Sequence, residues 1–441
     1  MQPITRAVAL VAAAVLASAG VTACGDSSDS GNKTITYWAT NQSTSLDADK
    51  QVLQPELDKF TAQTGVKVKV EVVPNSDLLN RVLTATTSGK GPDVLNIGNT
   101  WSASLQATGA FVAWDKTMMD KVGGESRFLP TALKSTGASG QDPAALPLYA
   151  SAYGLYYNKK LFKAAGISTP PKTWSEFVTD AHKLTKDTNG DGKPDQWGLG
   201  LQGASPSFAA HFAFILGTQH GAEVFSGNTP KLDDAAMVDG IDQWVSWIGK
   251  DGIVNPSDAE TTDRVALLKN FASGKSAMIL AQASTGRTLT QYDMTADDFG
   301  AAPVPAQDSP PAGAKDIGSF VAGINVAIFK NTGNLDGSTQ FVRFLTSAEE
   351  QVILNKAYGT IPSVTDAKDP AFDTPALTVA RETLANRSVP LPQITGEAQF
   401  ETLVGKSMTA FAAQAATGKQ PSLDAIKSEM TAANQKLAAG S

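Results

Sequence analysis

Apolar and polar residues alternate in the first third of the chain in a way that predicts three strands separated by two helices. Residues 34–38 (TITYW) and 66–73 (VKVKVEVV) alternate with the period of a strand, and 92–97 (PDVLNI) is a third strand. Apolar residues at helical spacing predict helices over 53–64 and 78–87. This order predicts an α/β lobe with a mostly parallel sheet.

Two polar loops, residues 39–44 and 98–102, follow the first and third of these strands. Ligands of such sheets bind at the loops that leave the carboxyl ends of the strands. The candidate ligand-binding residues in this part of the chain are Trp38, Asn41, Gln42, Asn99 and Trp101. Trp101 lies in a loop and is predicted to be a platform for the ligand. Trp38 ends a buried strand, so packing in the core stays an open alternative for it.

The segment 147–177 changes from an aromatic strand to a short helix, which a proline pair stops, and then to a second helix. Thr173, with Glu176 three residues later, predicts a capping box at the start of that second helix. We interpret the segment as a rigid junction between two lobes. Tyr149 and Tyr153, where the chain enters the second lobe, are candidates for the wall of the ligand cleft.

The composition limits the classes of function. A chain of 441 residues exceeds one ordinary core and suits two lobes, and 42% hydrophobic residues exclude wholesale disorder. The formal net charge of −7 argues against a nucleic-acid-binding protein, which would show a basic stripe. A neutral or weakly charged ligand fits this composition better.

The N-terminal segment has the features of a targeting signal. Arg6 precedes an apolar run that is too short to span a membrane, and small residues lead to Cys24, the single cysteine of the chain. This arrangement resembles the lipobox of bacterial lipoproteins, which implies a signal peptide over 1–23 and a lipidated Cys24. The polar stretch 24–33 is then a flexible tether, and the protein is expected on the extracellular face of the cell membrane. A plain secretory signal is the alternative.

Sequence motifs of common enzymes are missing. The chain has no nucleophile elbow, phosphate loop, HExxH motif or dinucleotide fingerprint. Its histidines, His182, His211 and His220, lack the spacing of a helical zinc pair and are interpreted as ordinary polar or core residues. We therefore expect binding without catalysis and no required cofactor. A surface glycosidase stays an alternative, because sequence spacing cannot exclude a catalytic pair of carboxylates.

One loop, DTNGDGKPD over 187–195, has the spacing of a calcium site. Oxygen ligands fall at positions 1, 3, 5, 7 and 9, and Gly192 stands at position 6, where the loop turns sharply. Position 12 is Gly198 and not glutamate, so a polar turn is an equally good interpretation. The candidate ligands of a structural Ca²⁺ are Asp187, Asn189, Asp191, the carbonyl of Lys193 and Asp195.

Several motifs occur in the order found in a known family. They are GPDV at 91–94, LYYNK at 155–159, KNFASGKSAM at 269–278, AGIN at 322–325 and FVRFLTSAEEQ at 341–351. Together they resemble the solute-binding proteins of bacterial ABC sugar transporters, the family of the maltodextrin-binding protein. The resemblance covers nearly all of the chain after the signal segment.

The resemblance implies a periplasmic-binding-protein-like fold, in which two α/β lobes are joined by a hinge of several crossings and hold the ligand in the cleft between them. It places lobe 1 at 34–147 and 300–348, and lobe 2 at 148–299 and 349–441. It also implies a monomer that captures an oligosaccharide and delivers it to ABC permease subunits in the membrane.

The resemblance adds four candidates to the ligand site, namely Gln282, Ser284, Phe320 and Phe400. Ser284 stands near a place where the family often has a sugar-stacking tryptophan, so the ligand is expected to differ from maltodextrin. Segments 47–67 and 94–114 look like those of actinobacterial chito-oligosaccharide receptors, with cello- or xylo-oligosaccharides as rivals. A receptor for peptides or metal complexes is a further alternative.

Overall fold

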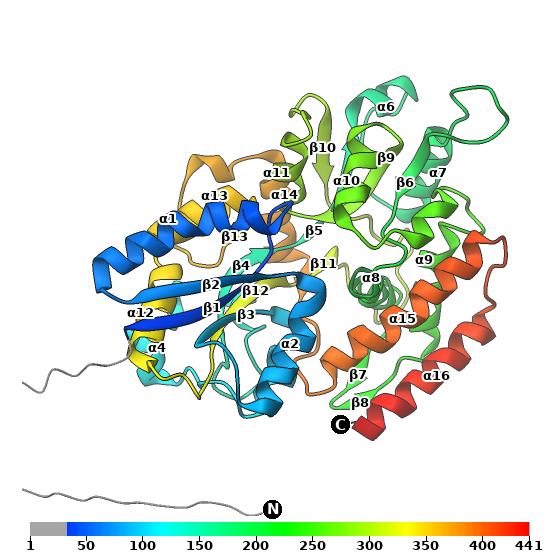
Figure 1. Ribbon diagram of the computed structural model, residues 1–441. Coiled ribbons are helices and arrows are strands. Elements are labelled where there is room, and N and C mark those ends of the chain that lie inside the picture. The colour runs from blue at the N-terminus through cyan, green and yellow to red at the C-terminus, as the bar shows by residue number, and fades with distance from the viewer. Residues whose placement is uncertain (1–32, 441) are drawn as a thin grey trace, which may run out of the picture. The chain divides into compact units, whose positions relative to one another are not determined.

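The computed structural model describes residues 33–440, which form a six-stranded and a four-stranded sheet with helices on both faces of each (Figure 1). The six-stranded sheet has the order β13-β4-β12-β3-β1-β2. Its strands are β1 (Thr34–Thr40), β2 (Lys67–Val73), β3 (Val94–Gly98), β4 (Leu146–Ser151), β12 (Ala322–Ile328) and β13 (Ile361–Pro362). Strand β1 pairs in parallel with β2 and β3, whereas β12 runs antiparallel to β3 and β4.

The predicted order of strand, helix, strand, helix and strand is confirmed, with longer helices than expected. Helix α1 (Leu46–Thr64) begins seven residues before the predicted start, because the Ser45 side chain accepts a hydrogen bond from the Ala48 N–H and caps it. Helix α2 (Asn75–Ser88) packs on one face of the sheet through Leu78 and Val82. Helix α1 covers the opposite face.

Other short elements and two further helices complete this part of the chain. Helix α12 lies on the face covered by α1, and α13 packs against α1. The elements are η1 (Asn99–Trp101), α3 (Ser102–Ala107), α4 (Lys116–Lys121), η2 (Glu125–Arg127), α5 (Pro130–Leu133), α12 (Leu335–Leu345) and α13 (Ala348–Tyr358).

The four-stranded sheet has the order β10-β5-β9-β6. Its strands are β5 (Tyr153–Asn158), β6 (Trp197–Gly200), β9 (Ser276–Gln282) and β10 (Phe299–Ala302). Around it lie α6 (Lys159–Ala164), α7 (Trp174–Leu184), α8 (Pro206–Gln219), α9 (Ala235–Ser246), η3 (Pro256–Glu260), α10 (Arg264–Ala272), α11 (Thr285–Thr290), α15 (Glu397–Ala416) and α16 (Leu423–Gly440). The predicted capping box of α7, between Thr173 and Glu176, is confirmed.

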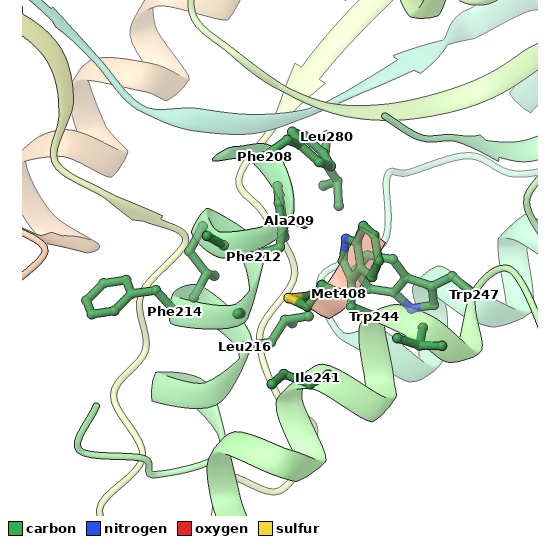
Figure 2. Close-up of a cluster of buried hydrophobic side chains, with 14 of the residues drawn as sticks. Phe208, Ala209, Phe212, Phe214, Leu216, Ile241, Trp244, Trp247, Leu280 and Met408 are labelled. Carbon is green, nitrogen blue, oxygen red and sulfur yellow. The ribbon is translucent and has the colours of Figure 1, made fainter. Parts of the chain in front are cut away.

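Helix α8 is the centre of the larger hydrophobic core. It is apolar all round, as expected of a helix that neighbouring elements surround, and α9 and α15 pack along it (Figure 1). Figure 2 shows the side of α8 that faces Trp244, Trp247 and Met408, which come from α9, the residue after it and α15, while Phe214 points to the opposite side. This core fixes α8 and α15 relative to each other, and both helices contribute to the site described below.

The chain passes between the two sheets several times. Strands β4 and β5 are separated by Ala152 alone, and β10 leads back to β12 through β11 (Ser319–Phe320). After β13, the chain continues through η4 (Pro370–Phe372), α14 (Pro375–Asn386) and β14 (Ser388–Val389), which pairs with β11. A separate hairpin consists of β7 (Phe225–Ser226) and β8 (Thr229–Pro230). These crossings form the predicted hinge.

The predicted lobe boundaries stay a prediction, because 32–441 is one compact unit. The strand pairing nevertheless departs from them at three places. Residues 149–151 of β4 pair with β12 in the six-stranded sheet, although the predicted boundary puts them in lobe 2. Residues 361–362 pair with β4 in the six-stranded sheet although they were assigned to lobe 2, and residues 300–302 pair with β5 in the four-stranded sheet although they were assigned to lobe 1. The expected signal peptide, the lipidated Cys24 and nearly all of the tether lie outside the described residues.

Candidate functional site

A buried chain of hydrogen bonds connects the two sheets. The Trp101 indole N–H in η1 donates to Oε2 of Glu401 on α15 at 2.9 Å, and Oε1 of Glu401 lies 3.1 Å from Nε2 of His211 on α8. Nδ1 of His211 lies 3.0 Å from the hydroxyl of Tyr153, the first residue of β5. We call Trp101, Glu401, His211 and Tyr153 the polar seam. It joins the loop after β3 to β5 of the second sheet and to α8 and α15 of the core beside that sheet.

The polar seam holds a negative charge on Glu401. Burial acts to raise the pKa of this carboxyl, but hydrogen bonds from His211, Trp101 and Thr100 outweigh burial and lower the pKa below its usual value. An ionised carboxylate only accepts hydrogen bonds, so Nε2 of His211 carries the hydrogen that faces it. Nδ1, the other ring nitrogen of His211, is hydrogen-bonded to the Tyr153 hydroxyl. Aromatic rings flank the imidazole, and the Phe320 ring centre lies 4.2 Å away.

A second carboxyl, Glu397, lies one helical turn before Glu401 on α15 and has no such partners. It is completely buried, and neither of its carboxyl oxygens has a hydrogen-bond partner among the described residues. Burial, with the negative charge of Glu401 nearby, holds the pKa of Glu397 well above its usual value. A buried polar group without partners costs free energy of folding, so this carboxyl needs an explanation.

Further contacts hold η1 and α3 against the hinge and the start of α15. The Asn99 amide N–H donates to the Val321 carbonyl at 2.6 Å. The Ser104 hydroxyl donates to the Thr395 carbonyl at 2.7 Å. The loop after β3 therefore meets the second half of the chain through polar contacts, and a ligand can exchange these for its own hydroxyl groups.

The loop after β9 contacts both the first sheet and the polar seam. The Ala283 N–H donates to the Ser151 hydroxyl of β4 at 3.2 Å, which places the loop beside the first sheet. Ser284 is buried, and Gln282 interacts with the Tyr153 hydroxyl. Arg264 donates from Nη2 to Thr288 Oγ1 at 2.8 Å and forms no ion pair among the described residues. Its burial lowers the pKa of the guanidinium.

Three other candidates are not members of the polar seam, although Trp38 packs against the same apolar cluster as Trp101. The Trp38 ring stacks under the Arg81 guanidinium at 4.3 Å, which favours the packing alternative. Asn41 accepts from the Asn75 N–H at 2.8 Å and so fixes the start of α2. Gln42 donates from its side chain to the Asn41 carbonyl at 3.0 Å. Ligand binding by these residues stays a prediction.

The aromatic candidates fall into two groups. Tyr149 packs edge-on against Tyr358 in the core of the first sheet, and Phe400 is completely buried against Phe225 in the core of the second. Both rings face cores, so the structure favours packing over sugar stacking for them. Tyr153 and Phe320 also pack in the second core, but both contact His211 of the polar seam.

The 187–195 loop is organised by hydrogen bonds to its own backbone. Both carboxyl oxygens of Asp187 accept from backbone N–H groups, those of Gly190 and Gly192. Asp195 accepts from the N–H and hydroxyl of Thr188. Within residues 33–440, no group of three or more His, Cys, Asp or Glu side chains is arranged to hold a metal ion. This geometry is that of a polar turn, and calcium binding stays a prediction.

A cavity of about 1050 Å³ lies beside α4, α5 and the segment 390–393. None of the predicted ligand residues lines it, and neither does any member of the polar seam. We place the candidate site at the polar seam and not in this cavity, because the seam joins aromatic and charged side chains from both halves of the fold.

The family model for bacterial extracellular solute-binding proteins matches residues 43–352. The chain belongs to this family. The match spans every strand of the four-stranded sheet and four strands of the six-stranded sheet, leaving out β1 and β13. Within residues 33–440, no helix has both the length and the apolar character needed to cross a bilayer.

Individual relatives of this solute-binding protein recognise different solutes. The diacetylchitobiose-binding protein DasA of Streptomyces coelicolor is 26% identical over 360 residues, with 78% of each chain covered. The sn-glycerol-3-phosphate-binding protein UgpB of Brucella melitensis is 25% identical over 389 residues, covering 82% of this chain and 84% of UgpB.

Solved structures show the same fold. The GacH receptor of Streptomyces glaucescens, studied unliganded and with acarbose, has a TM-score of 0.74 at 24% identity and covers 92% of this chain and 98% of its own. MalE of Bdellovibrio bacteriovorus, bound to maltotriose, has a TM-score of 0.75 at 21% identity and covers 92% and 100%. The predicted fold class is thereby confirmed.

Sequence reasoning missed three polar residues of the site in this solute-binding protein: His211, Glu397 and Glu401. A signal for two of them was present. On α15, the apolar residues at 400, 404, 408 and 411 form one stripe, and Glu397 and Glu401 are spaced four residues apart beside it. Carboxyls on the buried face of a helix whose apolar residues pack in a core indicate a functional role for that face. Nothing in the sequence near His211 indicated its partners.

Proposed function

We propose that this solute-binding protein captures an oligosaccharide at the polar seam and delivers it to an ABC permease. The observation that carries the proposal is the seam itself, in which aromatic and charged side chains from both halves of the fold converge. Ring faces match the C–H faces of a pyranose, and carboxylates and imidazole match its hydroxyl groups. The site thus offers the two kinds of contact that sugar recognition requires.

Contacts from both sheets also provide a mechanism for capture. A ligand favours a closed arrangement of two lobes only through interactions that it makes with both. Trp101 approaches the seam from the first sheet, and His211 and Tyr153 belong to the second core. A sugar that bonds to both groups would favour the closed arrangement, in which the permease is expected to recognise the protein.

One relative, DasA, supports a sugar other than maltodextrin, whereas the structural neighbour MalE was solved with maltotriose. DasA binds diacetylchitobiose, and GacH was studied with acarbose. Ser284 takes the place near which a stacking tryptophan is common in the maltodextrin-binding pattern. We propose a ligand of the chito-oligosaccharide type, with cello- and xylo-oligosaccharides as the next candidates. Lipid anchoring through Cys24 and a monomeric state are part of the same proposal.

A panel of ligands tests this function. Oligosaccharides of the chito, cello, xylo and malto series are added to the protein, together with sn-glycerol 3-phosphate because UgpB is a relative. The bound ligand raises the melting temperature by linkage and is recovered chemically unchanged. Recovery of a cleaved sugar indicates a glycosidase instead. Stabilisation by glycerol phosphate, peptides or metal complexes alone contradicts the proposal.

A structural Ca²⁺ in the 187–195 loop is a separate proposal. The ion would replace the backbone N–H groups as the partner of Asp187 and Asp191, because Ca²⁺ prefers hard oxygen ligands. Calcium should raise the melting temperature, and a chelator should reverse the change. A melting temperature that neither addition moves contradicts the proposal. Asp187→Asn provides the matched control.

A further inference from the structure

Glu397 is a buried carboxyl that the fold does not use. It is 0% exposed, and both of its oxygens lack partners among the described residues. By contrast, Glu401 on the next turn has three partners, namely Trp101, His211 and Thr100. A structural carboxyl in a core would be expected to have partners of this kind.

The surroundings of Glu397 are acidic. Glu401 lies four residues away on the same helix, where side chains of one face meet. Among residues 33–440, no lysine or arginine forms an ion pair with either carboxyl, and the ring of His211 is already engaged by Glu401 and Tyr153. The ionised Glu401 therefore places a negative charge one helical turn from Glu397.

We propose that Glu397 contacts the ligand directly, and that the preferred ligand is an oligosaccharide carrying a protonated amino group. This inference rests on the proposed function and specifies the class of sugar. The ammonium group would donate hydrogen bonds to the free oxygens of Glu397 and supply a positive charge that this carboxyl lacks among the described residues.

Simple energetics favour an ammonium over a neutral hydroxyl at this position. A carboxylate and an ammonium form a charge-assisted hydrogen bond, which is about twice as strong as a neutral one. Away from bulk water, the attraction between the two charges is also less screened. An N-acetylated sugar carries no charge at the same nitrogen and would leave Glu397 without its counterion.

Two disaccharides that differ only in acetylation test the proposal. Chitobiose, with free amino groups, and N,N′-diacetylchitobiose are titrated by calorimetry into the wild-type protein at about pH 6, below the pKa expected of such amino groups. Cellobiose serves as the neutral analogue without nitrogen. We expect chitobiose to bind about tenfold more tightly than diacetylchitobiose.

Two variants assign the preference to Glu397. Glu397→Gln keeps the shape of the side chain and should reduce the preference to within about threefold, by weakening chitobiose and not diacetylchitobiose. Glu382→Gln, which removes an exposed carboxyl on α14, should retain the full preference. Melting temperatures show that both variants are folded.

The outcomes separate this inference from the proposed function. Equal affinities for the two disaccharides, or a preference that survives Glu397→Gln, overturn the role of Glu397 while leaving oligosaccharide binding intact. If cellobiose or diacetylchitobiose binds and chitobiose does not, the role of Glu397 is likewise overturned while oligosaccharide binding stands. If no oligosaccharide binds at all, the proposed function fails and the inference fails with it.

Discussion

Two buried tryptophans, Trp101 and Trp174, both donate their indole N–H to a side-chain oxygen, but their surroundings differ. Trp174 donates to Oε1 of Gln219 at 2.6 Å, and the Gln219 amide donates in turn to the carbonyls of Pro305 and Ile317. That cluster lies within the larger core and contains no charge. Each oxygen and N–H of the Gln219 amide group is hydrogen-bonded.

The cluster around Trp101 is organised in the opposite way. Its acceptor is the ionised Glu401, and its bonds link elements of two different sheets. One turn away, Glu397 is left entirely without partners. Buried polar groups in a structural core are normally satisfied. In the larger core the indole N–H groups of Trp244 and Trp247 are single neutral donors without a partner among the described residues, whereas Glu397 leaves both oxygens of a carboxyl unpartnered. The comparison thus indicates that the Trp174 cluster serves stability and the Trp101 cluster serves recognition.

Trp174→Ala should have the largest effect on stability. The substitution removes a ring that packs against Phe177 and Trp247 at 5.2 Å each, and it leaves Oε1 of Gln219 unpaired. We expect a loss of about 3–5 kcal/mol in the free energy of unfolding, measured with denaturant. Affinity for the ligand should stay within about twofold, and a loss beyond tenfold would erase the distinction between the two clusters.

Trp101→Ala should show the reverse pattern. Affinity for the bound oligosaccharide should fall by at least about tenfold, which is ~1.4 kcal/mol, because a ring platform and a partner of Glu401 are both lost. Stability should fall less than in Trp174→Ala. Trp101→Phe is the matched control, since it keeps a ring and removes only the N–H. Unchanged affinity in Trp101→Ala removes this residue from the site.

Glu397→Gln should make the protein more stable at neutral pH. The folded-state pKa of Glu397 is raised above its unfolded value, so this group destabilises the fold increasingly as pH rises above about 4.3, the ordinary value for glutamate. At pH 7 the gain should be at least about 1 kcal/mol. The difference from wild type should shrink toward pH 4, and Glu382→Gln should show no such trend. If the gain in the free energy of unfolding is the same at every pH, Glu397 is not a buried carboxyl whose pKa rises on folding.

Thr173→Ala should have the smallest effect. The Thr173 side chain accepts from the Glu176 N–H, and their capping box fixes the start of α7 far from the polar seam in sequence. Its loss should cost about 1 kcal/mol of stability, read from chemical denaturation. Ligand affinity should not change, and a weakened affinity would mean that the start of α7 is coupled to the site.

Local patterns of the sequence determined much of the fold. The alternation in β2, the helical spacing in α2 and the capping signal at Thr173 each depend on residues close together in the chain. The ordered motifs then indicated the arrangement of lobes. The extent of α1 was underestimated because the Ser45 cap lies ahead of the apolar positions that marked the helix.

The candidate site was harder to predict because its contacts are distant in sequence. Trp101 and Glu401 are 300 positions apart, and Glu401 and His211 are 190 apart. Position after a strand identified Trp101, but the same rule also selected Trp38, whose ring packs against Arg81. Aromatic character selected Phe400, whereas its acidic neighbour Glu401 belongs to the polar seam.

The assignment of the polar seam as a sugar site is best tested by calorimetric titration of wild-type protein and Trp101→Ala with the same panel of oligosaccharides. At least one oligosaccharide should bind the wild-type protein and be recovered intact, and Trp101→Ala should weaken its binding by about tenfold or more while remaining folded. An oligosaccharide that binds both proteins equally, or a panel from which none binds, would contradict the assignment of the polar seam as a sugar site.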